Sequence, residues 1–171
     1  CLLDRNKLNN DLANFLNQLG PRQCKIYLLH GNMSKKEISS LYTHPQVKCL
    51  VSATRGEGFG LPLIEAAASG LPIAATNWSG HLDFLSNKFA KIDYNLIDIP
   101  SARIDNRIFF KGHKWANPNT DDIGKKIKDI FLNIDNYKQQ ALALKQEVIN
   151  NFSKERSHNM YNKIFKECLV E

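Results

Sequence analysis

The sequence predicts an α/β fold in which a parallel sheet carries helices on both faces. Short apolar runs alternate with segments of helical periodicity three times in succession. Turn-forming residues such as glycine, proline and asparagine separate these segments. Strands that follow one another through helices pair in parallel, because a parallel return needs a crossover. We therefore expect a Rossmann-like architecture.

The expected elements follow a simple order along the chain. The first is an amphipathic helix that ends at Gly20-Pro21, with its apolar positions at Leu8, Leu12, Phe15, Leu16 and Leu19. Strands are then expected at residues 25–29, 47–52 and 71–76. A helix follows each strand: the first is capped by Ser34 with Glu37 completing a capping box, and the others cover 61–69 and 79–85.

The pattern weakens beyond these units. Residues 87–118 scatter isoleucine, tyrosine, phenylalanine and tryptophan among proline, asparagine and glycine, which predicts one or two short strands and a long loop. After Pro118 the chain is expected to be helical to its end. The side chains expected to cap these three helices are Asn119 or Thr120, then Asp135, then Ser153.

Size and charge narrow the class of protein. The 171 residues suffice for one full core and contain no linker-like stretch, so we expect a single domain over residues 1–171. No run approaches the roughly 18 apolar residues of a membrane span, and the first ten residues lack the order of a signal peptide, which predicts a cytoplasmic protein. The formal charge of +6 leaves a membrane surface open as a partner. No basic stripe is interleaved with aromatic residues, so no nucleic acid is expected.

The four cysteines predict neither a metal site nor a redox motif. Cys1, Cys24, Cys49 and Cys168 lie far apart, without the close pairs that such sites use. We interpret them as free thiols and propose no metal. Cys24 and Cys49 sit in strand-like runs, where a buried cysteine acts as a small apolar residue.

The segment most informative about function is residues 55–65, Arg-Gly-Glu-Gly-Phe-Gly-Leu-Pro-Leu-Ile-Glu. It joins an expected strand to an expected helix, and ligands of parallel sheets bind at this carboxyl edge. Glycines there let the backbone approach a bound group, and the free N–H groups of the following helix favour phosphate. Pro62 suits the first helical turn, because its missing N–H would have no partner there. The loop therefore suits a diphosphate.

A dinucleotide-binding motif is the alternative interpretation of this loop, and it fails on spacing. Gly56 and Gly58 would supply the first two glycines of a G-x-G-x-x-G pattern, but the third position falls on Leu61. What the loop carries instead is a pair of carboxylates, Glu57 and Glu65. Carboxylates repel phosphates and accept hydrogen bonds from hydroxyls, so a ligand with phosphates flanked by sugar hydroxyls fits the whole loop. A nucleotide-sugar is such a ligand.

The pair Glu57 and Glu65 resembles the E-x7-E motif of retaining glycosyltransferases with the two-lobed B-type fold, a family that includes many lipopolysaccharide, capsule and mannosyl transferases. Residues 70–76 look like the strand that follows this motif in the family. Residues 79–83, Ser-Gly-His-Leu-Asp, look like its G-G-x-x-E turn, with serine for the first glycine and aspartate for glutamate. Residues 151–156 resemble the start of its C-terminal helix. The resemblance runs from about Lys25 to about Phe165.

The resemblance implies a role for each residue of the motif. Glu57 would accept hydrogen bonds from the transferred sugar, as a donor-positioning residue and not a nucleophile. Glu65 would hold the ribose. No cofactor or metal is implied, and the donor is the nucleotide-diphosphate sugar itself. The positions implied to contact the sugar, the diphosphate and the base are Gly58, Phe59, Gly60 and Leu61 in the loop, with Gly31 and Asn32, followed by Met33, at the base.

The chain departs from the family in two respects. The basic pair that contacts the diphosphate follows the family's first strand, and this chain starts after that point; Arg55 is either a partial substitute or a solvated loop residue. The N-terminal lobe that supplies acceptor contacts is also missing. We therefore expect a fragment of a longer two-lobed enzyme that is inactive alone. His30, His81 and His113 are interpreted as structural or surface residues, and Trp78 and Trp115 either line an acceptor site or pack.

Three rival functions differ in class. The first is the donor-binding domain of a glycosyltransferase, which the paired glutamates and tight glycines favour. The second is a non-catalytic binding or scaffolding module of the same fold. The third is a sugar-nucleotide epimerase or a phosphorylase, which share the two-lobed architecture. A phosphorylase needs a lysine for pyridoxal phosphate, for which no suitable context is found, and the E-x7-E loop fits an epimerase poorly.

Overall fold

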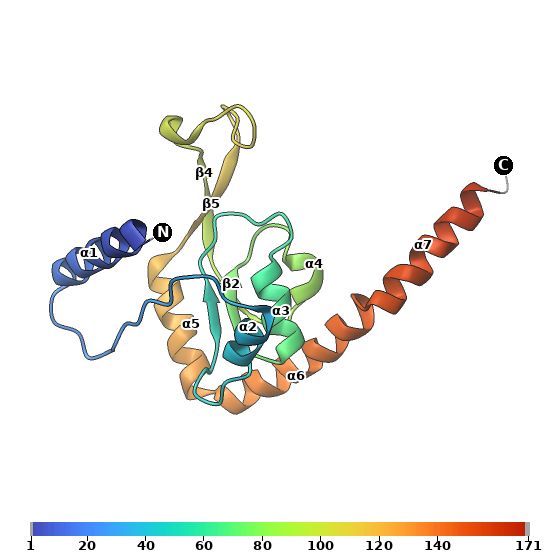
Figure 1. Cartoon of the computed structure of the whole chain (residues 1–171), viewed down its shortest axis with the longest axis horizontal. Coiled ribbons are helices and arrows are strands. Elements are labelled where there is room, and N and C mark those ends of the chain that lie inside the picture. Colours follow the sequence, from blue (N-terminus) through green and yellow to red (C-terminus); the bar gives the residue numbers. More distant parts are fainter. Residues whose placement is uncertain (1, 170–171) are drawn as a thin grey trace. The chain divides into compact units, whose positions relative to one another are not determined.

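The computed structural model describes residues 2–169 (Figure 1). The chain divides into two compact units, one up to Lys36 and one from Glu37 onward. The first unit contains helix α1 (Leu2–Gln18) and an extended segment after it. The guanidinium of Arg5 in α1 donates a hydrogen bond to the carbonyl of His30, at 3.2 Å. This contact ties the extended segment to the helix.

The expected strand at residues 25–29 is wrong. These residues have no regular structure, and Tyr27 and Leu29 are 81% and 68% exposed. A strand needs a second backbone to pair with. The unit that contains this segment holds a helix instead of a partner strand, so the apolar composition alone does not produce a strand there.

The second unit is built on a parallel sheet of three strands in the order β1-β2-β3. These strands are β1 (Leu50–Ser52), β2 (Ile73–Thr76) and β3 (Ala90–Ile92). Leu50 pairs with Ile73, and Ala74 pairs with Ala90. The α/β class and the parallel sheet are therefore confirmed. The third strand comes from the region where the sequence pattern weakens.

Helices cover both faces of this sheet. On one face, Ile73 and Ala75 pack in a cluster with α3 (Leu61–Ser69), α4 (Leu82–Leu85) and α6 (Ile134–Asn151). On the other face, Ala74 packs with Ile130 of α5 (Thr120–Leu132). All four residues of β2 are buried, as expected for the central strand of a covered parallel sheet. Helix α2 (Lys35–Tyr42) precedes β1 along the chain.

An antiparallel hairpin extends the chain beyond β3. It consists of β4 (Tyr94–Asp98) and β5 (Lys114–Pro118), with Tyr94 opposite Pro118 and Asp98 opposite Lys114. A short 3-10 helix, η1 (Ser101–Arg103), lies in the connection between these strands. Only Asp93 separates β3 from β4, so the hairpin leaves from the carboxyl edge of the sheet (Figure 1).

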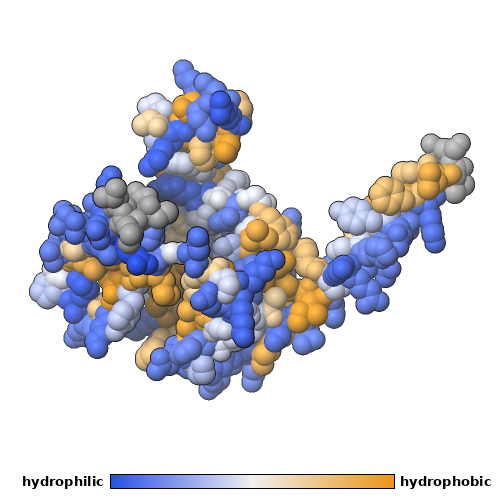
Figure 2. All heavy atoms as spheres, viewed as in Figure 1, coloured by the Kyte–Doolittle hydropathy of each residue, from blue (hydrophilic) through white to orange (hydrophobic). Residues whose placement is uncertain are grey.

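The C-terminal helices begin largely where the sequence predicts. Asn119 caps α5 by accepting hydrogen bonds from two backbone N–H groups, and Ser153 caps α7 (Lys154–Cys168) by accepting one, from the N–H of Arg156. Asp135 lies in the first turn of α6, one residue past the N-terminal residue, so it is not the cap. The side chains of Ile164 and Phe165 on α7 are 50% and 61% exposed, and this helix carries both apolar and polar side chains (Figure 2).

The cysteines follow the sequence expectation in part. Cys24, Cys49 and Cys168 are free, and Cys1 lies outside the described residues. Cys24 is exposed, which corrects the expectation that it is buried, because its segment forms no strand. Cys49 is half-buried, and this burial raises the pKa of its thiol. No helix within residues 2–169 is both long enough and apolar enough to span a membrane.

Replacement of Leu144 by alanine tests the packing of α6 on the core. Leu144 is 1% exposed in the cluster that contains α3 and β2, whereas Leu142 on the same helix is 56% exposed. We expect Leu144→Ala to lower the free energy of unfolding by about 2–5 kcal/mol, because it leaves a cavity. Leu142→Ala is the matched control and should cost less than about 1 kcal/mol. Urea denaturation measures both, and equal losses would contradict this packing.

Candidate functional site

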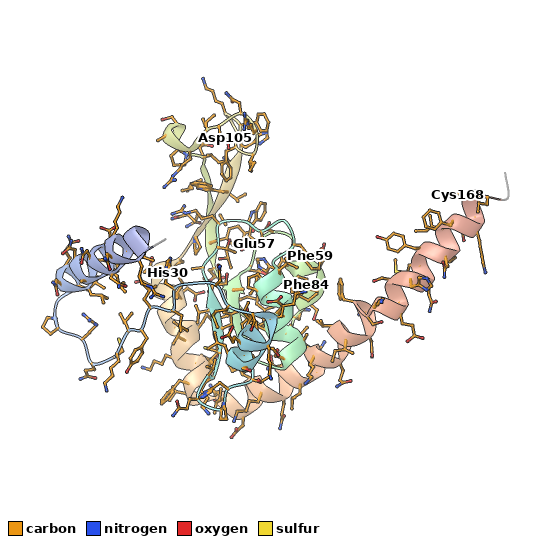
Figure 3. All side chains as sticks on the ribbon, in the orientation of Figure 1. His30, Glu57, Phe59, Phe84, Asp105 and Cys168 are labelled. Atoms are coloured by element: carbon orange, nitrogen blue, oxygen red, sulfur yellow. The ribbon has the colours of Figure 1, made fainter. Side chains whose placement is uncertain are left out.

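Two loops meet at the carboxyl edge of the sheet. Residues 53–60 connect β1 to α3, and residues 77–81 connect β2 to α4. Because β1 and β2 are adjacent parallel strands, their carboxyl ends bring these two loops side by side. Glu57 and Phe59 both lie in the first loop (Figure 3). The predicted loop position is therefore confirmed.

Hydrogen bonds to the backbone of Glu57 join the two loops. The backbone N–H of Glu57 donates to Oγ of Ser79 at 3.0 Å, and the Ser79 hydroxyl donates to the carbonyl of Glu57 at 2.6 Å. The N–H of Gly80 donates to the same carbonyl at 3.1 Å. We call this set of three hydrogen bonds the Glu57 clamp. The Glu57 clamp holds the backbone of Glu57 in place through the loop between β2 and α4.

The clamp requires unusual backbone at the turn that supplies it. Ser79 has a φ of 91°, a value that is uncommon for residues other than glycine. The two hydrogen bonds of its hydroxyl offset this strain. A Cβ on Gly80 would lie 2.1 Å from the carbonyl oxygen of Gly58, so only glycine permits this approach. The glycine-serine turn and the loop therefore fit together closely.

The first turn of α3 begins at the end of the clamped loop. Gly60 precedes the helix with a φ of 89° and provides no side-chain cap, and Pro62 occupies the first turn. No acidic side chain lies in that turn. The partial positive charge of the helix N-terminus and the N–H of Leu61 therefore lie at the carboxyl edge of the sheet, because Pro62 has no N–H and the N–H groups of Leu63 and Ile64 donate to the carbonyl of Gly60. Leu61 is 64% exposed at this position.

Both predicted glutamates carry carboxylates without a partner. Within the described residues, neither the Glu57 nor the Glu65 side chain forms a hydrogen bond or an ion pair; Glu57 is half-buried and Glu65 is exposed on α3. Tyr42 of α2 lies near Glu65: burial, and after it the charge of Glu65, raises the pKa of the Tyr42 hydroxyl. The sequence pattern did not identify Tyr42 as a neighbour of the site.

The side chain of Phe59 anchors the loop to two other aromatic residues. Its ring centroid lies 5.2 Å from that of Phe84 on α4 and 6.0 Å from that of Phe152 after α6 (Figure 3). Phe84 is 4% exposed, whereas Phe59 remains 40% exposed. Aromatic rings at these separations attract one another, so the contacts with Phe84 and Phe152 hold Phe59 in place while its backbone stays at the loop surface.

His81 lies in the core behind the two loops. It is fully buried, and its Nε2 is 2.7 Å from the carbonyl of Thr76. A carbonyl only accepts hydrogen bonds, so Nε2 carries a proton. Nδ1 is buried without a partner among the described residues. A Cβ on Gly60 would come within 3.2 Å of the His81 Cβ, so this histidine supports the loop from its inner side.

The hairpin also contacts the loop through Arg55. The N–H of Ala116 in β5 donates to the carbonyl of Arg55 at 3.0 Å, and the Arg55 guanidinium lies 5.1 Å from the centroid of the Trp115 ring. On the other loop, Trp78 packs 5.5 Å from Tyr94 of β4. Trp78 thus packs against the base of the hairpin, whereas Trp115 belongs to the hairpin and contacts Arg55 of the loop. No sequence signal identified Tyr94 or Ala116 as part of this arrangement.

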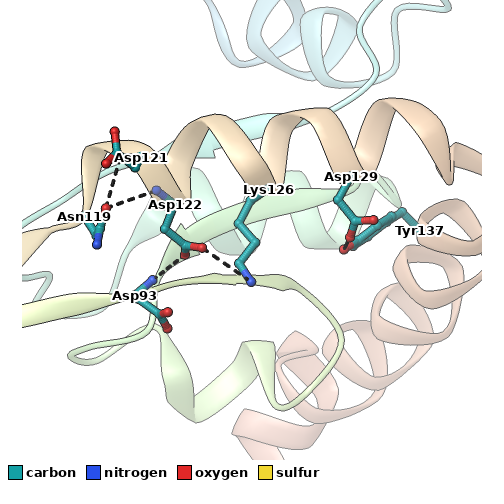
Figure 4. Close-up of polar contacts among 7 residues, drawn as sticks. All are labelled: Asp93, Asn119, Asp121, Asp122, Lys126, Asp129 and Tyr137. Carbon is teal, nitrogen blue, oxygen red and sulfur yellow. Dashed lines mark hydrogen bonds and ion pairs between the residues drawn. The ribbon is translucent and has the colours of Figure 1, made fainter.

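Polar contacts with α5 hold Asp93, the residue that joins β3 to the hairpin (Figure 4). The carboxylate of Asp122 accepts a hydrogen bond from the N–H of Asp93 at 2.8 Å, and Lys126 lies 3.8 Å from the other oxygen of Asp122. The N–H of Asn119 donates to the carbonyl of Asp93 at 2.8 Å. The junction between β3 and β4 is therefore fixed to the start of α5.

Gly31 and Asn32, predicted to seat the base, belong to the first unit of the chain. The candidate site described above lies entirely in the second unit, so their role stays a prediction. Among the residues that the structure describes, no three histidine, cysteine or acidic side chains gather in a group that would hold a metal ion.

Comparison with protein families decides the class of this chain. A model of the glycosyl transferases group 1 family matches residues 23–140, more than half of the sequence. The chain belongs to the group 1 glycosyl transferases. The matched region of this glycosyl transferase contains both loops of the site, the glutamates and the hairpin. Family membership supports a function in glycosyl transfer, carried by an enzyme of the glycosyltransferase type.

Two further comparisons returned no relatives. No curated protein and no solved structure matches this glycosyl transferase.

Replacement of Gly80 by alanine tests the close approach of the two loops. The added Cβ would collide with the Gly58 carbonyl and force the Glu57 clamp apart. We expect a loss of about 2–4 kcal/mol in the free energy of unfolding. Gly124→Ala is the matched control: space within α5 is open at that position, and alanine should stabilise the helix by about 0.5–1 kcal/mol. Thermal unfolding compares the two, and a stable Gly80→Ala variant would refute the clamp.

Proposed function

We propose that this chain binds a nucleotide-diphosphate sugar on residues 57–65, as the C-terminal donor-binding lobe of a retaining glycosyltransferase with the two-lobed B-type fold. One observation carries the proposal. The backbone of Glu57 is held by three hydrogen bonds while its carboxylate has no partner among the described residues. A fixed, unpaired carboxylate beside a helix N-terminus suits a ligand that combines hydroxyls with phosphates.

Each part of the ligand has a complementary group at the site. The diphosphate lies at the start of α3, where Gly58, Phe59, Gly60 and Leu61 offer backbone N–H groups and the first helical turn carries no acidic side chain. The sugar hydroxyls donate hydrogen bonds to Glu57. The exposed Glu65 accepts hydrogen bonds from the ribose. No metal or cofactor is needed for this recognition.

The proposed reaction keeps the configuration of the transferred sugar. An acceptor hydroxyl attacks the anomeric carbon from the face of the departing diphosphate. The bond from that carbon to the diphosphate oxygen breaks, and the nucleoside diphosphate leaves with the electron pair. The acceptor proton passes to an oxygen of the leaving phosphate. Glu57 positions the sugar throughout and forms no covalent bond, so it is a donor-positioning residue.

We assign the acceptor contacts to the N-terminal lobe of a longer parent protein. The basic residues that contact the diphosphate are assigned to the region after the first strand of that parent. Residues 1–171 then form the donor domain and depend on that lobe for activity. Arg55 is occupied by its contact with Trp115, which supports the interpretation that it supplements a basic pair and does not replace it.

Removal of the Glu65 carboxylate tests ribose recognition. We expect Glu65→Ala to weaken binding of a nucleoside diphosphate by about 10–100-fold, because a hydrogen bond to a charged group contributes about 1.5–3 kcal/mol. Calorimetric titration with UDP, GDP and ADP measures the effect and identifies the base. Glu167→Ala on α7 is the control and should bind as the unmodified chain does. If neither this chain nor its longer parent binds any of the three, the donor site is wrong.

Removal of the Glu57 charge tests whether this carboxylate contributes to binding of the sugar and not of the nucleotide. We expect Glu57→Gln to weaken binding of the nucleotide-sugar by about tenfold while leaving the affinity for the free nucleoside diphosphate unchanged, because Glu57 contacts only the sugar. Titration of both ligands with the same variant gives the comparison. Equal weakening of both ligands would instead place Glu57 at the diphosphate and contradict its proposed role.

A further inference from the structure

The end of the hairpin has a structure of its own, distinct from the candidate donor site. The N–H of Ile99 donates to the carbonyl of His113 at 3.0 Å and closes residues 99–113 as a unit, which we call the hairpin tip. One oxygen of the Asp105 carboxylate accepts hydrogen bonds from the N–H groups of Arg107, Ile108 and Phe109, each at 2.9 Å. Hydrogen bonds from Phe109, Arg107 and Ile108 lower the pKa of Asp105. The Asp105 carboxylate therefore stabilises the backbone of its own turn.

Neighbouring apolar side chains of this turn differ in their surroundings. The ring of Phe109 packs against Trp115 of β5, with their centroids 5.6 Å apart. Ile108 is 73% exposed and Phe110 is 42% exposed. Two large apolar side chains thus stay at the surface of an ordered turn in which a third, Phe109, is half-buried. Ile108 has one of the most exposed aliphatic side chains in the described part of the chain.

Positive charge surrounds the exposed apolar side chains. Arg103, Arg107 and Lys111 are exposed, and none of them forms an ion pair within the described residues. Asp105 is the single acidic residue of the tip, so three cations and one carboxylate give a net charge of +2. Figure 2 shows hydrophobic and hydrophilic side chains side by side at the end of the hairpin.

We propose that the hairpin tip docks this protein on a membrane surface that contains anionic lipids, with Ile108 and Phe110 entering the interface and Arg103, Arg107 and Lys111 contacting the headgroups. Apolar side chains among basic residues are the combination that binds such an interface, through burial and attraction together. A narrow tip at the end of a two-stranded ribbon suits a broad surface better than it suits a folded acidic partner. The inference goes beyond the proposed function and does not rest on it.

The docked orientation follows from the fold. The hairpin leaves the carboxyl edge of the parallel sheet, and its strands contact Arg55 and Trp78, one in each loop of the candidate site. A tip on the membrane therefore turns that edge of the sheet toward the bilayer. An acceptor embedded in the same surface would then face the loops.

Sedimentation with lipid vesicles tests the docking directly. The unmodified chain should bind vesicles of phosphatidylcholine mixed with phosphatidylglycerol and not vesicles of phosphatidylcholine alone, and added salt should weaken the binding. The double variant Arg107→Glu with Lys111→Glu should bind at least about tenfold more weakly, because each cation near an anionic surface contributes to binding. Lys125→Glu with Lys128→Glu on α5 changes the net charge equally and should have less than about a threefold effect.

A second pair of variants tests insertion of the apolar side chains. Ile108→Ser should weaken vesicle binding by about five- to tenfold through lost burial. Ile164→Ser on α7, an exposed position at 50%, should leave binding unchanged. Full binding by Ile108→Ser, equal losses in either control, or no binding by the unmodified chain would overturn the proposal. Competition by soluble polyglutamate as effective as that by the anionic vesicles would also overturn it, in favour of an acidic protein partner.

Discussion

The candidate site depends on the hydrogen bonds between Ser79, Gly80 and the backbone of Glu57. Adjacent parallel strands bring the two loops together, but adjacency alone leaves loops mobile. The serine hydroxyl joins both backbone groups of Glu57, and the glycine allows the chains to approach to contact. Phe59 and His81 then support the same loop from its inner side. As a result, the Glu57 carboxylate is presented by a rigid backbone, and rigidity of this kind lowers the cost of binding a ligand.

The hairpin connects this site to a distant surface. Asp122 and Asn119 hold Asp93, the residue that joins β3 to the hairpin, and Ala116 bonds to the loop that carries Glu57. The proposed donor site and the proposed membrane contact therefore share one framework, although they depend on different residues. Their chemistry also differs: one uses unpaired carboxylates and helix N–H groups, whereas the other uses cations and exposed apolar side chains. This separation explains why each proposal has its own variants.

The sequence predicted best where local chemistry decides the structure. Helix α3 matches its expected bounds because Gly60, Pro62 and Gly70 mark its ends, and the caps Asn119 and Ser153 need only nearby backbone. Prediction failed where the structure of a segment depends on a partner that is distant in the sequence. Residues 25–29 look like a strand but have no second backbone to pair with, whereas β4 pairs with a strand beyond a long, irregular tip. The glutamates were identified from their spacing, but no local pattern reveals that Ser79 would hold one of them. The assignment of residues 1–171 to one donor domain stays a prediction.

The account rests on the claim that the loop between β1 and α3 binds the donor. Backbone amide chemical shifts, recorded by NMR while a nucleotide-sugar is added, test it most directly. We expect the largest changes at Gly58, Phe59, Gly60 and Leu61, with a second group around Glu65. Changes confined to another part of the molecule, such as the groove that His44, Lys48 and Leu71 line at the opposite edge of the sheet, would contradict the account.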